Sequence, residues 1–162
     1  LVFGIDDQTM EMALADLLGH HDLSLAVAES VTGGMIAARL TAVPGGSAWL
    51  RGGIVSYSTD VKQDVLGVPE GPVVTPAAAI AMAEGVRRVL GADIGVAVTG
   101  VAGPTKQEGQ PIGTVFAGLA LPGEDPVALD FHLTGDRQRI REFACINVLD
   151  ALRRRLLAQP VG

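Results

Sequence analysis

The sequence predicts an α/β fold: a three-layer α/β/α sandwich around a mixed, mostly parallel sheet. Short apolar runs alternate along the chain with longer runs of helical periodicity, which is typical of helices packed on a sheet. The last two apolar runs are joined only by residues 122–126, a link that favours an antiparallel hairpin over a crossover. The 162 residues are 48% hydrophobic, enough to build one core, so we expect a single domain over residues 1–162.

The first half of the chain supplies two of the expected strands. A helix is expected after Asp6 or Asp7, either of which can cap it, and Gly19 with the following histidine pair closes it. The run 23–29 predicts a buried strand, and 35–40 predicts a helix that Pro-Gly-Gly at 44–46 breaks. Residues 49–58 predict a strand with a Gly-Gly irregularity, and 59–66 predict a short helix.

The second half begins with the clearest helix signal. Thr75 at the cap position and Pro76 in the first turn open a helix that runs to Leu90. A buried strand over 93–99 and a polar, glycine-containing loop over 100–110 follow. The hairpin strands are expected over 112–121 and 127–133, and a long helix runs from Asp136 to about residue 157.

Charge and cysteine content restrict the class of partner and compartment. The 18 acidic and 12 basic residues give a net charge of −6, which argues against nucleic acid or an anionic membrane surface as a partner. No apolar run approaches the length of a membrane span. The only cysteine, Cys145, cannot form an intrachain disulfide, and this favours a reducing, cytoplasmic location.

Several familiar motifs are missing. No two glycines have the spacing of the dinucleotide fingerprint, and no G-x-S-x-G elbow occurs. The stretch Gly100–Lys106 is rejected as a phosphate loop because Pro104 and Thr105 replace the glycine required before the lysine. The histidines at 20, 21 and 132 lack metal-ligand spacing and are interpreted as surface residues.

A candidate nucleophile lies at a junction between an expected strand and the next helix, in the stretch AESVTGG at 28–34. Ser30 would lie at the carboxyl end of the strand, beside free backbone N–H groups that can stabilise an oxyanion. Gly33 and Gly34 allow a ligand to approach the backbone, and the helix dipole favours an anion there. The alternative is that Ser30 or Thr32 only caps the helix and that the glycines ease packing.

A nucleophilic serine needs a base, and lysine is the best candidate in this chain. There are ten arginines, which cannot be deprotonated, and only two lysines. Lys62 follows an expected strand, and burial could lower its pKa enough for it to accept a proton. Tyr57 nearby could relay or orient that proton. The alternative for Lys62 is a solvated surface lysine.

Further polar residues are expected at the same edge of the sheet. Thr99 follows another apolar strand, and ligands of α/β sheets bind at the carboxyl ends of strands. Arg137 and Arg141 are four residues apart and share a helical face that could hold a phosphate or a carboxylate. The alternative is a solvent-exposed basic stripe, extended by Arg139 and by residues 153–155.

Six blocks, in this order, resemble the CinA C-terminal domain family, the nicotinamide-nucleotide amidohydrolases. They are AESVTGG (28–34), RLTAVPGGSAWLRGGIVSYS (39–58), K-x-x-x-LGV (62–68), AVTGVAGP (97–104), PIGTVFAGLA (111–120) and F-x-L-T-GDR-x-x-IR (131–141). The similarity covers residues 8–157. It implies a CinA-like fold and, since the family's frequent N-terminal domain is missing, the stand-alone amidase form.

The resemblance implies that the chain hydrolyses the amide of nicotinamide mononucleotide to nicotinate mononucleotide and ammonia, in pyridine nucleotide salvage. It implies Ser30 as nucleophile and Lys62 as base, with Tyr57 assisting. The residues implied to bind substrate are Thr32, Gly33 and Gly34 in an anion-binding turn, Thr99, Gly100 and Gly103 lining the pocket, and Arg137 and Arg141. It implies no metal and no organic cofactor, a small-molecule nucleotide substrate, and a homo-oligomer, with a dimer favoured.

Two other functions stay open at this point. A catalytically inactive paralogue could bind a nucleotide and regulate a partner protein. An amidase could also act on another pyridine or nucleotide amide, because residues 105–110 replace several glycines that the family usually has in that loop.

Overall fold

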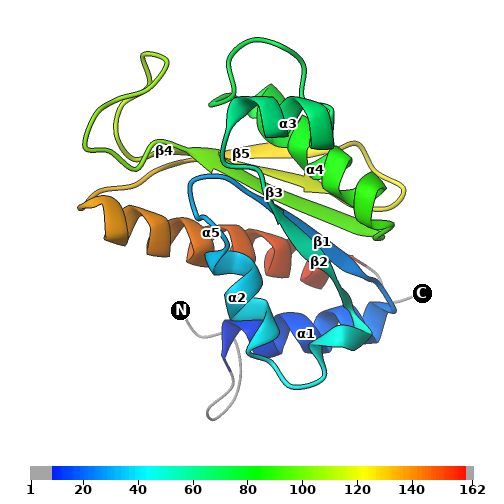
Figure 1. Cartoon of the computed structure of the whole chain (residues 1–162). Coiled ribbons are helices and arrows are strands. Elements are labelled where there is room, and N and C mark those ends of the chain that lie inside the picture. The colour runs from blue at the N-terminus through cyan, green and yellow to red at the C-terminus, as the bar shows by residue number, and fades with distance from the viewer. Residues whose placement is uncertain (1–8, 160–162) are drawn as a thin grey trace.

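The computed structural model describes residues 9–159 and has helices on both faces of one five-stranded sheet (Figure 1). The elements are α1 (Met10–His21), β1 (Leu25–Glu29), α2 (Met35–Thr41), the 3₁₀ turn η1 (Gly46–Ala48), β2 (Leu50–Val55), α3 (Thr59–Leu66), α4 (Pro76–Leu90), β3 (Ile94–Gly100), β4 (Thr114–Ala120), β5 (Val127–His132) and α5 (Arg137–Ala158).

The sheet is mixed, as predicted, but its strand pairs are divided equally: two are parallel and two are antiparallel. Its strand order is β2-β1-β3-β4-β5. Strand β1 runs parallel to both β2 and β3, while β4 is antiparallel to its neighbours β3 and β5. The carboxyl ends of β1, β2 and β3 therefore meet at one edge of the sheet, where Glu29 pairs with Val55 on one side and Val98 on the other.

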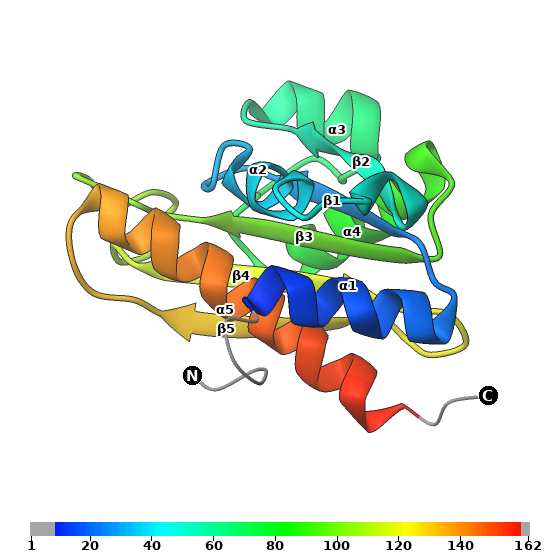
Figure 2. The ribbon, with the colours of Figure 1, turned by 90° about the horizontal axis from the view of Figure 1, so that it is seen from below.

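The two faces of the sheet carry different cores. Helices α1, α2 and α5 cover one face, where large side chains such as Leu25 and Val27 point, and α1 and α5 lie across it in Figure 2. Helices α3 and α4 cover the other, where Ala26 and Ala28 point. Side chains alternate along a strand, so one strand supplies both faces. The small residues facing α4 let that helix lie close to the sheet.

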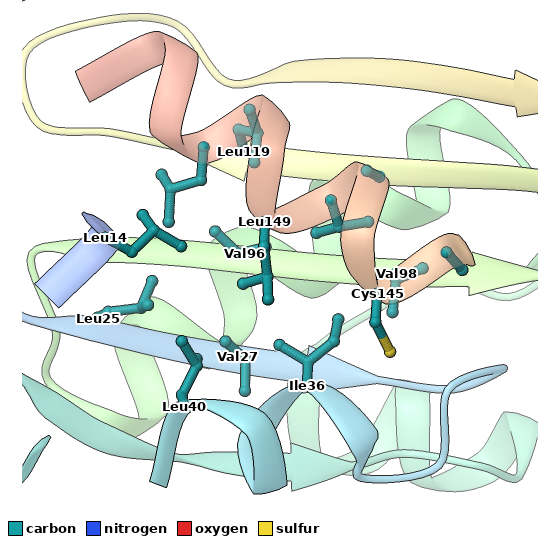
Figure 3. Packing of buried hydrophobic residues seen from close by; sticks show 14 of the residues in the cluster. Leu14, Leu25, Val27, Ile36, Leu40, Val96, Val98, Leu119, Cys145 and Leu149 are labelled. Carbon is teal, nitrogen blue, oxygen red and sulfur yellow. The ribbon is translucent and has the colours of Figure 1, made fainter. Parts of the chain in front are cut away.

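Cys145 belongs to the larger core. In Figure 3 its side chain lies among Ile36, Val98 and other apolar residues of that cluster. It is fully buried, and this burial raises the pKa of its thiol to about 12. A thiol that remains protonated is a packing group rather than a nucleophile.

The element boundaries differ from expectation at a few places. Helix α1 is capped by Thr9, whose hydroxyl accepts from the N–H of Met12 at 3.2 Å. The expected caps, Asp6 and Asp7, lie outside the described residues. The helix continues through both histidines and ends at Asp22, which has a left-handed backbone. Strand β2 (Leu50–Val55) is shorter than the expected 49–58. Just after it, the N–H of Ser56 donates to the carbonyl oxygen of Glu29 at 2.8 Å.

Candidate functional site

A pocket of about 320 Å³ lies at the carboxyl ends of β1, β2 and β3. Ser30, Tyr57 and Thr99 come from these three strand ends, as expected from parallel strands. The full lining is Ser30, Val31, Tyr57, Thr59, Lys62, Val73, Val74, Thr99, Gly100, Val101, Ala102, Gly103, Thr105, Lys106, Gln107 and Arg137.

Ser30 extends β1 by one hydrogen bond and then leaves the strand. Its N–H donates to the Val98 carbonyl oxygen at 3.1 Å, and its carbonyl oxygen accepts from Gly33 N–H at 3.0 Å. The turn that follows needs left-handed backbone at Gly33 (φ 60°) and Gly34 (φ 105°), which glycine adopts without steric cost. The serine side chain is only slightly exposed and opens into the pocket.

The amino terminus of α2 is occupied by a side chain of the protein itself. Glu29 is 1% exposed, and its carboxylate accepts from the Thr32 hydroxyl at 2.6 Å, Ile36 N–H at 2.8 Å and Ala37 N–H at 3.0 Å. The N-cap residue is Gly34, so neither Ser30 nor Thr32 caps this helix. The sequence predicts a bound anion at this helix terminus. In the structure, the carboxylate of Glu29 is that negative group.

Thr32, Gly33 and Gly34 therefore shape the turn but do not line the pocket. Thr32 is fully buried, with its hydroxyl turned to Glu29, while Gly33 is exposed. Gly33 lies against the guanidinium of Arg141, since a Cβ there would come within 3.1 Å of Nη2. The implied contact of these three residues with substrate stays a prediction.

Lys62 is buried in the wall of the pocket, which excludes the solvated-lysine interpretation. It lies on α3, is 2% exposed, and donates from Nζ to the carbonyl oxygen of Tyr57 at 3.1 Å. Burial lowers the pKa of its ammonium group, because the charged form is poorly solvated there, and the negative charge of Glu108 opposes this shift. Because its pKa is lowered, a larger fraction of Lys62 than of a solvated lysine is the neutral amine at physiological pH.

Tyr57 contacts Lys62 through its backbone and not through its hydroxyl. Its side chain is 62% exposed at the rim, where the hydroxyl accepts from Nη2 of Arg137 at 3.0 Å. Arg137 also donates from Nη1 to the Gly103 carbonyl oxygen at 2.6 Å. The first turn of α5 thus joins the loop after β2 to the loop after β3 across the rim.

The two arginines of the predicted basic face have separate positions. Arg137 lines the pocket, whereas Arg141 does not. Arg141 donates from Nε to the Val31 carbonyl oxygen at 3.1 Å and from Nη2 to that of Thr32 at 3.3 Å. It therefore holds the turn that follows Ser30, while Arg139 lies over the ring of Phe143, 5.5 Å from its centre.

The remaining predicted residues lie in the wall. Thr99, Gly100 and Gly103 all line the pocket, and the Thr99 hydroxyl donates to the Val73 carbonyl oxygen at 2.8 Å. Val73 and Val74 were not anticipated, since their sequence carries only a turn signal before α4. Thr105, Lys106 and Gln107 also line the pocket. The sequence predicts their loop, but none of the three was expected as a site residue.

The pocket lining carries basic and no acidic side chains, although the chain as a whole is acidic. The basic residues are Lys62, Lys106 and Arg137, and the net charge of the whole sequence is −6. Such a lining favours a ligand that carries a negative group.

Residues 9–159 contain no group of three His, Cys, Asp or Glu side chains arranged to hold a metal ion. No helix in this range is both long and apolar enough to cross a bilayer.

The sequence model of the CinA C-terminal domain matches residues 7–156. The chain belongs to the CinA C-terminal domain family. This confirms the resemblance. A CinA-like protein of Frankia casuarinae is 50% identical over 164 residues, which cover 98% of this chain and 38% of that protein. The chain thus spans well under half the length of this relative. A CinA-like protein of Geobacter metallireducens is 43% identical over 159 residues, which cover 94% of this chain and 38% of that protein.

Solved structures of this family share the fold. The crystal structure of the competence damage-inducible protein A (ComA) from Klebsiella pneumoniae matches with a TM-score of 0.89 and 31% identity, over 93% of this chain and 97% of that one. A CinA superfamily protein from Escherichia coli matches with a TM-score of 0.85 and 29% identity, over 96% and 94%. The α/β architecture predicted from the sequence is therefore that of the CinA family.

Proposed function

We propose that this chain is an amidohydrolase that converts nicotinamide mononucleotide to nicotinate mononucleotide and ammonia, in pyridine nucleotide salvage. The observation that carries the proposal is the buried Lys62, whose pKa is lowered, in the same pocket as Ser30. A serine hydroxyl becomes a competent nucleophile when a neutral amine can take its proton. The family resemblance supplies the substrate.

The reaction has two balanced steps. Ser30 Oγ attacks the carboxamide carbon while neutral Lys62 Nζ takes the hydroxyl proton, and Lys62 then returns that proton to the departing ammonia. The nicotinoyl ester on Ser30 is hydrolysed by water, again with Lys62 as base, which releases the carboxylate and restores the serine. The Tyr57 carbonyl oxygen, which accepts from Nζ at 3.1 Å, orients the amine.

The oxyanion needs donors other than the start of α2, because Glu29 accepts from the N–H groups of Ile36 and Ala37. The N–H of Ser30 is also engaged, with Val98. Val31 lines the pocket, and its N–H has no hydrogen-bond acceptor within residues 9–159. We assign it as the donor. One such donor is worth about 3 kcal/mol of transition-state stabilisation where it has been measured.

The cationic wall accounts for a nucleotide rather than a free amide as substrate. Lys106 and Arg137 are exposed at the rim and can pair with the phosphate of a mononucleotide. A volume of about 320 Å³ lies within the range of small-ligand pockets.

The test is ammonia release from nicotinamide mononucleotide by the purified chain. We expect release by the parent, loss in Ser30→Ala and in Lys62→Arg, and full activity in Ser47→Ala, an exposed serine in η1 that serves as the matched control. Turnover that survives Lys62→Arg would contradict the base assignment, since arginine cannot be deprotonated.

A second candidate is an amidase for another pyridine or nucleotide amide. The observation that favours it is the contribution of Thr105, Lys106 and Gln107 to the lining, because this loop departs from the family pattern. A panel of amides in which nicotinamide mononucleotide is by far the best substrate would eliminate it. Binding of the nucleotide without ammonia release from any amide would instead favour the inactive, regulatory protein.

A further inference from the structure

Glu108 has an unusual backbone at the tip of the loop between β3 and β4. Its φ is 53°, in the left-handed region, and it is followed by Gly109 at φ 75°. The N–H of Gln110 donates to the carbonyl oxygen of Gln107 at 2.8 Å and closes the turn. A residue with a β-carbon rarely adopts this conformation, and it persists where surrounding contacts impose it.

The Glu108 carboxylate supplies those contacts. It accepts from the N–H of Val73 at 2.9 and 3.2 Å and from the N–H of Val74 at 2.9 Å. Both valines are almost fully buried and precede α4 in a segment that is neither helix nor strand. Without Glu108 these amides would have no acceptor among residues 9–159, which is costly in a buried segment.

These bonds join two walls of one pocket. Val73 and Val74 line one side, and Thr105, Lys106 and Gln107, just before Glu108, line another. The two segments are more than thirty positions apart along the chain, and the bonds to Glu108 fix their separation. Glu108 itself is exposed and does not line the pocket, so its role differs from that of a ligand contact.

We propose that Glu108 is a positioning residue that holds the loop 104–110 against Val73 and Val74, so that Lys106 and Gln107 face the bound ligand. This inference rests on the proposed function for its ligand. The loop would then recognise the anionic part of the substrate, and its position would depend on the carboxylate of Glu108.

Glu108 also sets the charge around Lys62. Its negative charge opposes the lowering of the Lys62 pKa by burial. In the pocket lining itself, the charged side chains besides Lys62 are Lys106 and Arg137. Loss of this negative charge should lower the pKa of Lys62 further, because its ammonium form loses a favourable partner. The acid limb of the pH profile of kcat/KM should then move to lower pH.

The experiment compares Glu108→Ala, Glu108→Gln and Glu70→Gln. Glu70 is an exposed glutamate near the same segment and controls for the loss of one charge. In Glu108→Ala we expect hydrogen exchange at the Val73 and Val74 amides to be about tenfold faster or more, with KM raised by about tenfold and kcat little changed. Glu108→Gln retains one acceptor oxygen and should show smaller effects on both, yet shift the acid limb downward.

Two results would overturn the proposal. One is exchange at Val73 and Val74 that is unchanged in Glu108→Ala. The other is faster exchange with KM and acid limb unaltered, because the loop position would then not matter to the ligand. If the parent releases no ammonia, the proposed function fails, whereas exchange at these two amides still decides whether Glu108 holds the loop.

Discussion

Replacement of Glu29 by alanine should cost more stability than its single charge suggests. The carboxylate is 1% exposed and accepts from the Thr32 hydroxyl and from the N–H groups of Ile36 and Ala37. Alanine leaves all three donors without an acceptor at the start of α2, and the two amides belong to the backbone, so no rotamer change can satisfy them. The perturbation therefore acts on the helix and on the turn that carries Ser30.

The magnitude follows from the number of orphaned donors. A buried amide left unpaired costs about 1–3 kcal/mol, and two of them give about 2–6 kcal/mol. Part of this is recovered where water enters the space left by the side chain, so we expect a loss of about 2–4 kcal/mol for Glu29→Ala. That is a large share of the roughly 5–15 kcal/mol by which domains are stable. Glu29→Gln keeps one acceptor oxygen and should lose about 1–2 kcal/mol.

The assay is urea denaturation of both variants, analysed with a common slope. Glu84→Ala, on the exposed face of α4, is the matched control and should change the free energy of unfolding by less than about 0.5 kcal/mol. The reasoning is refuted if Glu29→Ala behaves like this control. It is also refuted if the glutamine and alanine variants lose the same amount, because the retained oxygen would then have no role.

Two other predictions concern stability. Lys62→Met should raise the free energy of unfolding near neutral pH by about 1.4 kcal/mol for each unit by which burial lowers the lysine pKa from 10.5. The free-energy cost of burying the charged lysine is fully present below its pKa in the folded protein and disappears as the pH rises to 10.5. The gain in stability from methionine should therefore shrink in alkaline buffer. A gain that grows with pH would contradict this reasoning. Gly118→Ala should destabilise by about 1–3 kcal/mol, because a Cβ on β4 would overlap the carbonyl oxygen of Ala79 on α4. Gly19→Ala, in open space on α1, should stabilise by about 0.5–1 kcal/mol, and thermal melts that rank these two variants in the opposite order would refute the packing argument.

Local patterns were sufficient for the architecture. The short link at 122–126 predicted the β4–β5 hairpin, and Thr75–Pro76 predicted the start of α4, because both signals act over a few residues. The convergence of Ser30, Tyr57 and Thr99 also followed from the sequence, since parallel strands bring their carboxyl ends to one edge. Small errors remained at the ends, as at the Thr9 cap, where several residues could have served.

The identity of each partner was decided only by the tertiary structure. The sequence shows a helix start with glycines but does not tell whether a ligand or the protein's own Glu29 will meet its amides, since the direction of a side chain depends on strand register. Arg137 and Arg141 share a helical face, yet one reaches the pocket rim and the other the turn after Ser30, contacts that span more than thirty and more than a hundred positions of the chain.

The same holds for the two groups on which the proposals depend. The sequence predicted Lys62 as a base, but its burial, and hence the direction of its pKa shift, results from packing between α3 and the strand ends. Glu108 carried no local signal at all, because its carboxylate meets amides of a segment distant in sequence. Periodicity and turn chemistry are local and can be read from the chain, whereas burial and the pairing of charges depend on how distant segments pack together.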